Sequence, residues 1–128
     1  MSRMVALLGP KVRWALWALA LVGWTALLLR PEPAQVAGEV LPEQAVFPVA
    51  KLGHVGAYAV LTLLTAWLPV RVPGRFWLLA LVILHAPGTE WLQQFVEGRT
   101  GTVRDAVLDW VGIAVGVALT WRRWRPAP

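Results

Sequence analysis

Polar side chains that can bind ions or transfer protons recur at helical spacing inside apolar stretches of this sequence. Lys51, His54 and Tyr58 stand at positions i, i+3 and i+7, which places them on one face of a helix. An ammonium group can hold an anion, and an imidazole can accept or donate a proton near neutral pH. Such groups are costly in an apolar helix unless they have partners, so each is a candidate functional residue.

Two further pairs show similar spacing. Glu90 and Gln93 are three residues apart near the end of the next apolar stretch, and Asp105 and Asp109 are four apart at the start of the last one. Arg99 lies in the short segment between them. Glu90 stands about 21 Å along a helix that begins at residue 76, because a helix rises about 1.5 Å per residue. We therefore predict that three helices bring their polar faces together at one level.

Glu90 is the hardest of these residues to explain as ordinary packing. A carboxylate so deep in an apolar helix needs a cation, a shared proton or a water-filled cavity. Arg99, Lys51 and His54 are the available partners, so a structural ion-pair network is the main alternative to a ligand-binding site. A cation held by Glu90, the two aspartates and His54 is a variant, but no metal motif of known spacing supports it. We therefore predict no metal and no cofactor.

Several of these residues also have an ordinary structural interpretation. Thr102 and Asp105 have the spacing of a helix capping box, and the helix dipole favours an acid there. Lys51 would fit a lysine that reaches a membrane interface, and Tyr58 a packed aromatic residue with a bonded hydroxyl. Asp109 lies one turn deeper than Asp105, so capping does not explain it.

His85, Pro87 and two glycines are better explained by helix packing. His85 would lie near the middle of its helix, where we expect it to be neutral and hydrogen-bonded within the bundle. Pro87 frees backbone carbonyls in the preceding turn. Gly112 and Gly116 form a small-xxx-small pattern that suits close helix packing, either within the bundle or between two copies of the chain.

The composition favours lipid over water as the solvent for much of the chain. Apolar residues make up 58% of the 128 residues and charged residues 15%, too few to cover a soluble domain of this size. There is no cysteine, which excludes disulfides and thiolate sites. The apolar runs lack alternation, which favours helices over strands. We predict one all-α membrane domain, residues 1–128, with about four transmembrane helices at about 14–29, 52–70, 76–95 and 103–121.

The segments between the predicted spans contain helix-breaking residues. Residues 31–50 include four prolines and are predicted to be an irregular loop. Residues 69–75 are predicted to be a tight turn, and residues 96–102, with two glycines, a short loop.

Basic residues predict the orientation of the spans. Eight of them, and no acid, lie in the N-terminal tail, the second loop and the C-terminal tail, whereas all seven acids lie in or near the opposite side. The positive-inside rule therefore predicts that both termini are cytoplasmic. A signal peptide is the alternative for the first span, with Val36-Ala37-Gly38 as a cleavage candidate. A retained anchor is favoured, because that candidate lies eight residues beyond the apolar run.

Three motifs resemble those of one membrane protein family. Lys51-x-x-His54-x-x-x-Tyr58 resembles the second-helix signature of the VanZ-like family. Glu90-x-x-Gln93, followed by Gly98-Arg99, is similar to the family's E-x-x-Q followed by G-R. Asp105-x-x-x-Asp109-x-x-Gly112-x-x-x-Gly116 is similar to its D-x-x-x-N-x-x-G-x-x-x-G. The resemblance covers about residues 50–116.

The sequence departs from the family pattern at three positions. Ala50 stands where the family often has Asp, Glu97 where Pro is common, and Asp109 where Asn is usual. The last change adds a carboxyl group to the site. The resemblance implies a multi-pass protein of the bacterial cell membrane, in a family whose founding member is associated with resistance to the glycopeptide teicoplanin. It implies no defined reaction.

Two functions remain open. In the first, an outward-facing polar cluster binds an envelope lipid, a cell-wall precursor or a partner membrane protein, with Lys51, Arg99 and Arg104 holding phosphate or carboxylate. In the second, a small membrane enzyme acts on a lipid-linked phosphate or precursor, with His54 and Glu90 or Asp109 as acid and base and Arg99 stabilising phosphate charge. The candidate ligand-binding residues are Lys51, His54, Tyr58, Glu90, Gln93, Arg99, Asp105 and Asp109. A transporter ranks last and would need an oligomer, whose existence the sequence leaves open, and the apolar spans argue against nucleic acid as a partner.

Overall fold

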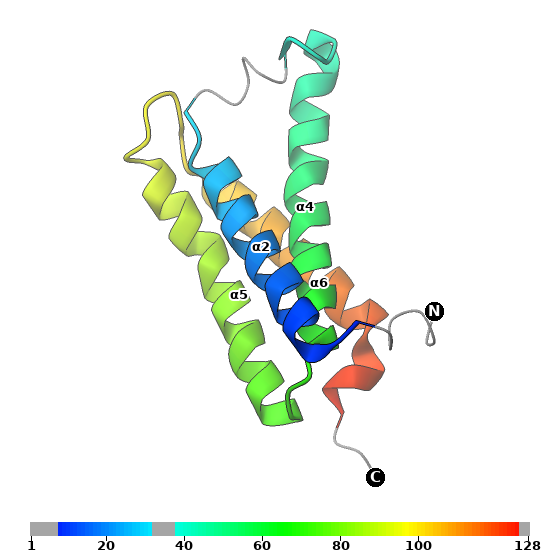
Figure 1. Ribbon diagram of the computed structural model, residues 1–128. Coiled ribbons are helices and arrows are strands. Elements are labelled where there is room, and N and C mark those ends of the chain that lie inside the picture. Colours follow the sequence, from blue (N-terminus) through cyan, green and yellow to red (C-terminus); the bar gives the residue numbers. More distant parts are fainter. Residues whose placement is uncertain (1–7, 32–37, 126–128) are drawn as a thin grey trace.

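A computed structural model describes residues 8–31 and 38–125 of the chain. These residues form four α-helices and one short 3₁₀-helix, with no strand among them, so the all-helical prediction is confirmed. Figure 1 shows the helices as a bundle. The helices are α2 (Pro10–Leu28), α4 (Glu43–Trp67), α5 (Val72–Gln93) and α6 (Val103–Leu119), followed by the 3₁₀-helix η1 (Trp121–Trp124).

Helix α4 begins earlier than the sequence predicts. Residues 43–50 are helical, so the predicted irregular loop over 31–50 is wrong for that part. Pro48 is the sixth residue of the helix, and the missing proline N–H removes only one backbone hydrogen bond there. Glu43 lies in the first turn, where the helix dipole favours a carboxylate.

The predicted turn over 69–75 is also shorter than expected. Helix α5 already begins at Val72, with Pro73 in its first turn, where a missing N–H costs nothing. Val36 and Ala37 of the candidate cleavage site and Arg3 of the basic N-terminal tail lie outside the described residues.

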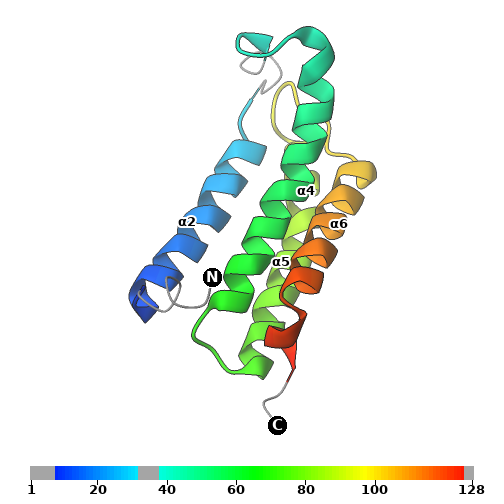
Figure 2. The ribbon, with the colours of Figure 1, turned by 90° about the vertical axis from the view of Figure 1, so that its right-hand side faces the viewer.

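Helices α4 and α6 pack closely because two glycines of α6 face α4. A Cβ atom added to Gly112 would lie 2.3 Å from the Val55 carbonyl oxygen, and one added to Gly116 would lie 2.6 Å from Thr62 Cβ. Figure 2 shows the two helices running side by side. The small-xxx-small pattern therefore serves packing within the bundle.

A tryptophan satisfies the carbonyl that Pro87 leaves free. Pro87 lies inside α5 and has no N–H to donate to Ile83, four residues earlier. The indole Nε1 of Trp110 on α6 donates to the Ile83 carbonyl oxygen over 3.1 Å. The predicted effect of the proline is thus confirmed, and the freed carbonyl joins α5 to α6.

The two ends of the bundle differ in charge. The start of α2, the turn between α4 and α5, and η1 lie at one end in Figure 1 and carry Lys11, Arg13, Arg71, Arg75 and the three C-terminal arginines. We call this the basic end. The opposite end holds the loop between α5 and α6 and the start of α4, and we call it the acidic end. Arg75 is buried and donates hydrogen bonds to carbonyl oxygens of Leu68, Val70 and Arg123, which ties the basic end together.

Apolar side chains cover the outside of the bundle. Leu19, Leu52 and Leu84 are each about 70% exposed, whereas soluble proteins rarely expose large apolar patches. Helices α2 and α4 are long and apolar enough to cross a membrane, judged by length and composition. The core helix of a soluble protein, which is mostly buried, and a signal sequence near the N-terminus would pass the same test; in α2, which lies near the N-terminus, only Trp17 and Leu28 are buried.

We expect Gly112→Ala to destabilise the protein by about 1–3 kcal/mol, because the new methyl group would overlap backbone atoms of α4. Gly56→Ala is the matched control, since a Cβ there meets nothing within 4 Å and alanine is about 0.8–1.0 kcal/mol better than glycine in a helix. Thermal unfolding of the purified variants checks this. Equal stability of the two variants would contradict close α4–α6 packing.

Candidate functional site

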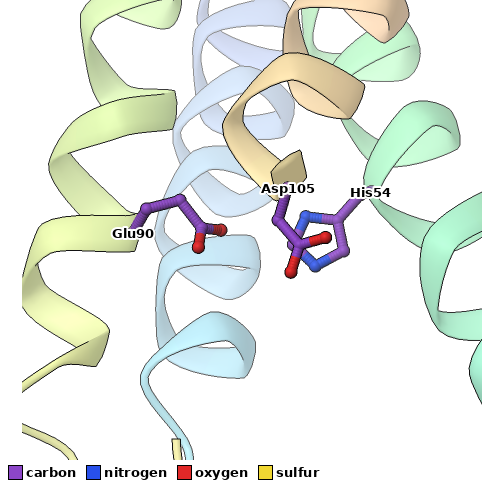
Figure 3. Close-up of side chains that lie close together, drawn as sticks. All are labelled: His54, Glu90 and Asp105. Carbon is purple, nitrogen blue, oxygen red and sulfur yellow. The ribbon is translucent and has the colours of Figure 1, made fainter. Parts of the chain in front are cut away.

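Three helices bring ionisable side chains together at the acidic end, as the spacing predicts. His54 of α4, Glu90 of α5 and Asp105 of α6 each place one nitrogen or oxygen ligand atom within 4.8 Å of the other two. In Figure 3 the Glu90 carboxylate points toward Asp105 and His54. All three residues are buried, with exposed fractions of 8%, 5% and 8% in chain order. Together with Lys51 and Asp109 they are called the polar cluster below.

Asp109 orients the imidazole of His54. Its Oδ1 lies 2.8 Å from His54 Nδ1, and its side chain is fully buried. An ionised carboxylate is a pure acceptor, so it stabilises a proton on Nδ1. The ring of Trp24 on α2 contacts His54 edge-on and limits its rotation from the other side. The arrangement leaves Nε2 of His54 with no hydrogen bond to the described residues.

Lys51 and Asp105 form an ion pair between α4 and α6. Thr102 is the N-cap of α6, and its hydroxyl oxygen accepts a hydrogen bond from the Asp105 N–H over 3.2 Å, which confirms the predicted cap. In a capping box the acid would return a bond to the Thr102 N–H. Here that N–H donates instead to Oε2 of Glu90 over 2.7 Å. Asp105 is thereby free to pair with Lys51.

None of the three cations proposed as partners for Glu90 forms an ion pair with it among the described residues. Lys51 pairs with Asp105, and His54 with Asp109. Arg99 donates from Nε to the Arg30 carbonyl and from Nη2 to the Leu27 carbonyl, at 3.1 and 3.0 Å. These carbonyls lie at the end of α2, where helix carbonyls lack intrahelical donors. The alternative of an ion-pair network therefore does not include Glu90 itself: the described ion pairs involve Asp105 and Asp109 instead.

Two glycines shape the loop that carries Arg99. Gly98 has φ of 72°, a left-handed conformation that side-chain-bearing residues rarely adopt. A Cβ on Gly101 would lie 1.7 Å from the Glu90 carbonyl oxygen, so only glycine lets the loop return against α5. Burial lowers the pKa of the Arg99 guanidinium, and the carboxylates of Glu90 and Asp105 act in the opposite direction. An arginine keeps its charge at neutral pH, so Arg99 remains a cation.

Gln93 and Tyr58 lie outside the polar cluster. Gln93 is buried and donates from Nε2 to the Leu28 carbonyl oxygen over 3.1 Å, which caps α2 beside Arg99. The Tyr58 hydroxyl lies 2.8 Å from His85 Nδ1 and 3.5 Å from the Thr89 hydroxyl. Tyr58 is thus a packed aromatic residue with a bonded hydroxyl, which was one of its two predicted interpretations.

A second polar network occupies the middle of the bundle, and sequence reasoning found only part of it. His85 Nε2 lies 2.7 Å from the hydroxyl of Thr25 on α2, so both ring nitrogens are bonded, as predicted for this histidine. Thr25 and Thr89 were missed because a threonine in a helix commonly bonds a carbonyl of its own preceding turn, and both also do so here. The sequence feature that could have indicated this network is a threonine inside an otherwise apolar span.

A pocket of about 850 Å³ opens beside the polar cluster. Its walls are the end of α2, the start of α4 and the loop between α5 and α6. Apolar residues such as Leu27, Leu41 and Phe47 form much of the lining. The polar residues that line it include Lys51, His54, Gln93, Arg99 and Asp105. Most of the residues predicted as ligand-binding therefore face one cavity, whereas Tyr58, Glu90 and Asp109 do not line it.

In comparisons with models of protein families, with curated proteins and with solved structures, none matches the chain. The resemblance to the VanZ-like family therefore stays a prediction.

We expect the His54–Asp109 pair to be strongly coupled in stability. Removing either residue leaves the other buried without its partner. The summed losses of stability in His54→Ala and Asp109→Ala should therefore exceed the loss in the double variant. The interaction free energy from a double-mutant cycle should be about 0.5–3 kcal/mol, measured by chemical unfolding. A cycle between His54 and Arg75, which lie at opposite ends, should be additive within about 0.5 kcal/mol. Additivity at both pairs would contradict the bond.

Proposed function

We propose that the chain is a multi-pass membrane protein whose four helices all cross the bilayer. The exposed apolar side chains on α5 and α6, which include Trp77, Leu84 and Leu119, support this beyond α2 and α4. Helix α6 has 17 residues, near the lower limit for a span, and the arginines that follow it can extend its reach. Helix α4, with 25 residues, is long enough to extend past the bilayer surface.

The charge difference between the two ends supports an orientation with both termini in the cytoplasm. The basic end carries arginines and lysine without a single acid, as the positive-inside rule requires of the cytoplasmic side. The polar cluster and the pocket then face the outer leaflet and the cell exterior. Because the chain has no cysteine, single introduced cysteines report on this directly.

We expect Glu97→Cys, at the acidic end, to react with a membrane-impermeant maleimide in intact cells. Pro69→Cys, in the turn at the basic end, should react only after the cells are permeabilised. Both residues are exposed, so the comparison depends on the side of the membrane. The reverse pattern would refute the orientation, and labelling of both in intact cells would refute the four-span arrangement.

We further propose that the chain is a VanZ-like protein of the bacterial cell membrane, and that its pocket binds the phosphate-bearing head of an envelope lipid or lipid-linked cell-wall precursor. The observation that carries this is the combination of an apolar wall with two cations in one cavity. Its volume falls within the range of small-molecule sites, about 300–1,000 Å³. The apolar wall suits acyl or prenyl carbons.

Arg99 is the best-placed residue for the phosphate. Its Nε and Nη2 donate to the carbonyl of Arg30, just beyond α2, and to that of Leu27 in α2, so the guanidinium is already oriented. Nη1 makes no hydrogen bond with the described residues and remains for a ligand oxygen. Lys51 is the second cation of the cavity, but it is shared with Asp105. A link to glycopeptide resistance is proposed on the family resemblance alone.

A membrane enzyme is the second candidate, and the His54–Asp109 bond is what favours it. A buried carboxylate that orients an imidazole is a common arrangement for a general base. Glu90 stands close enough to His54 to serve as the complementary acid. In this alternative the same lipid phosphate would be cleaved or transferred rather than only bound.

We expect Arg99→Ala to lower the retention of a phosphate-bearing lipid at least tenfold, because it removes the fixed cation of the pocket. Native mass spectrometry of the detergent-solubilised protein, supplied with phosphatidylglycerol or with a polyprenyl phosphate, measures the bound fraction. Arg71→Ala is the matched control, since it removes the same charge at the opposite end.

The pattern of bound mass separates the two functions. Retention of intact lipid by the wild type and its loss in Arg99→Ala supports binding. Release of a cleaved product, abolished in His54→Ala while lipid is still retained, supports the enzyme. Equal retention by Arg99→Ala and Arg71→Ala would refute the proposed lipid site.

A further inference from the structure

Glu90 has a buried oxygen atom without a partner. The residue is 5% exposed, and Oε2 accepts the Thr102 N–H. The other oxygen, Oε1, is buried and has no hydrogen-bond partner among the described residues. A buried carboxylate oxygen left in this way costs roughly 1–3 kcal/mol or more. The carboxylate faces Asp105 and His54 rather than the outside of the bundle (Figure 3).

The three residues around this oxygen form a donor set for a metal ion. They offer one imidazole nitrogen and two carboxylate oxygens, all within 4.8 Å of one another. Two ligands at about 2.0–2.2 Å from a tetrahedral zinc ion stand about 3.3–3.6 Å apart, so atoms within 4.8 Å of one another need to move about 1 Å closer. Small side-chain movements would therefore bring all three atoms into a first coordination shell. Because the ligands come from three helices, the site has no motif with a recognisable spacing in the sequence.

Asp109 completes the arrangement from behind His54. A metal-bound histidine almost always donates its other ring N–H to a carboxylate or carbonyl, which fixes the tautomer and the ring orientation. Asp109 is bonded to His54 Nδ1, which leaves Nε2 for the metal. Asp109 also explains why the site can hold a cation. Three carboxyl groups lie there with the Lys51 ammonium, and the Arg99 guanidinium acts on two of them, so a bound cation would offset the excess of acidic groups.

We infer that His54, Glu90 and Asp105 bind one divalent transition-metal cation, with Asp109 orienting the histidine. The imidazole favours Zn²⁺ over Mg²⁺ or Ca²⁺, which prefer oxygen ligands. Three protein ligands leave a coordination position open, as in catalytic and ligand-binding zinc sites. This inference goes beyond the proposed lipid binding and does not depend on it, because the ligand set contains neither Arg99 nor the apolar wall of the pocket.

The test uses Zn²⁺ and the full-length protein without added lipid. After chelation, dialysis and loading in detergent, elemental analysis should find one Zn²⁺ per chain, and titration calorimetry should give its affinity. Glu90→Gln should lower that affinity at least a hundredfold by removing a ligand. Asp109→Asn should lower it about 10–100-fold, because a residue behind a metal ligand typically contributes that much.

The histidine of the middle network provides the matched control. His85→Gln changes a half-buried histidine that bonds Thr25 and Tyr58 and belongs to no ligand set. It should bind Zn²⁺ as the wild type does, whereas His54→Gln should not. Failure of the wild type to bind Zn²⁺, equal loss in the two histidine variants, or stoichiometric Mg²⁺ that displaces Zn²⁺ would each overturn the inference. If a variant of the site does not fold, the wild-type stoichiometry and the Mg²⁺ competition still decide the question.

Discussion

The cost of burying carboxylates between apolar helices governs the architecture of the acidic end. Glu90, Asp105 and Asp109 are all at least nine-tenths buried. Each therefore needs donors that water would otherwise supply. The chain provides them from three sources: a side-chain ammonium for Asp105, an imidazole for Asp109, and the N-cap backbone of α6 for Glu90. Every one of these bonds joins two different helices. The acids therefore obtain their hydrogen-bond donors only when the helices pack together.

The glycines of α6 make this packing possible. Asp109 can reach His54 only if α4 and α6 approach closely, and Gly112 and Gly116 remove the Cβ atoms that would keep them apart. Gly101 does the same for the loop against α5, where the Glu90 carbonyl occupies the space of a side chain. The spacing of Gly112 and Gly116 after Asp109 in α6 thus has a physical reason. The glycines set the distance at which the aspartate bonds.

The sequence predicted the level of the polar cluster better than its pairing. Helical periodicity and a rise per residue are enough to place His54, Glu90 and Asp105 at one height, and they do meet. Pairing depends on which side chain is nearer by an ångström or two. Arg99 bonds the end of α2, because the last carbonyls of a helix need donors from elsewhere, and the position of α2 is not encoded in local spacing. Pro48 misled the boundary of α4, because the helix starts at Glu43 and continues through this proline although the proline removes a backbone hydrogen bond.

The two ends of the bundle solve opposite problems with the same kind of bond. At the basic end a buried cation, Arg75, has no acid beside it among the described residues; its Nη1 and Nη2 donate to carbonyl oxygens of the neighbouring turns, and its Nε has no partner there. At the acidic end Glu90 is satisfied at one oxygen by a backbone N–H and left unsatisfied at the other. Each end therefore keeps buried polar atoms without a partner among the described residues: donors at the basic end, and at the acidic end the acceptors Oε1 of Glu90 and Oδ2 of Asp109. Unpartnered carboxylate oxygens are acceptors that a cation can occupy, which is why we propose ligand chemistry at the acidic end.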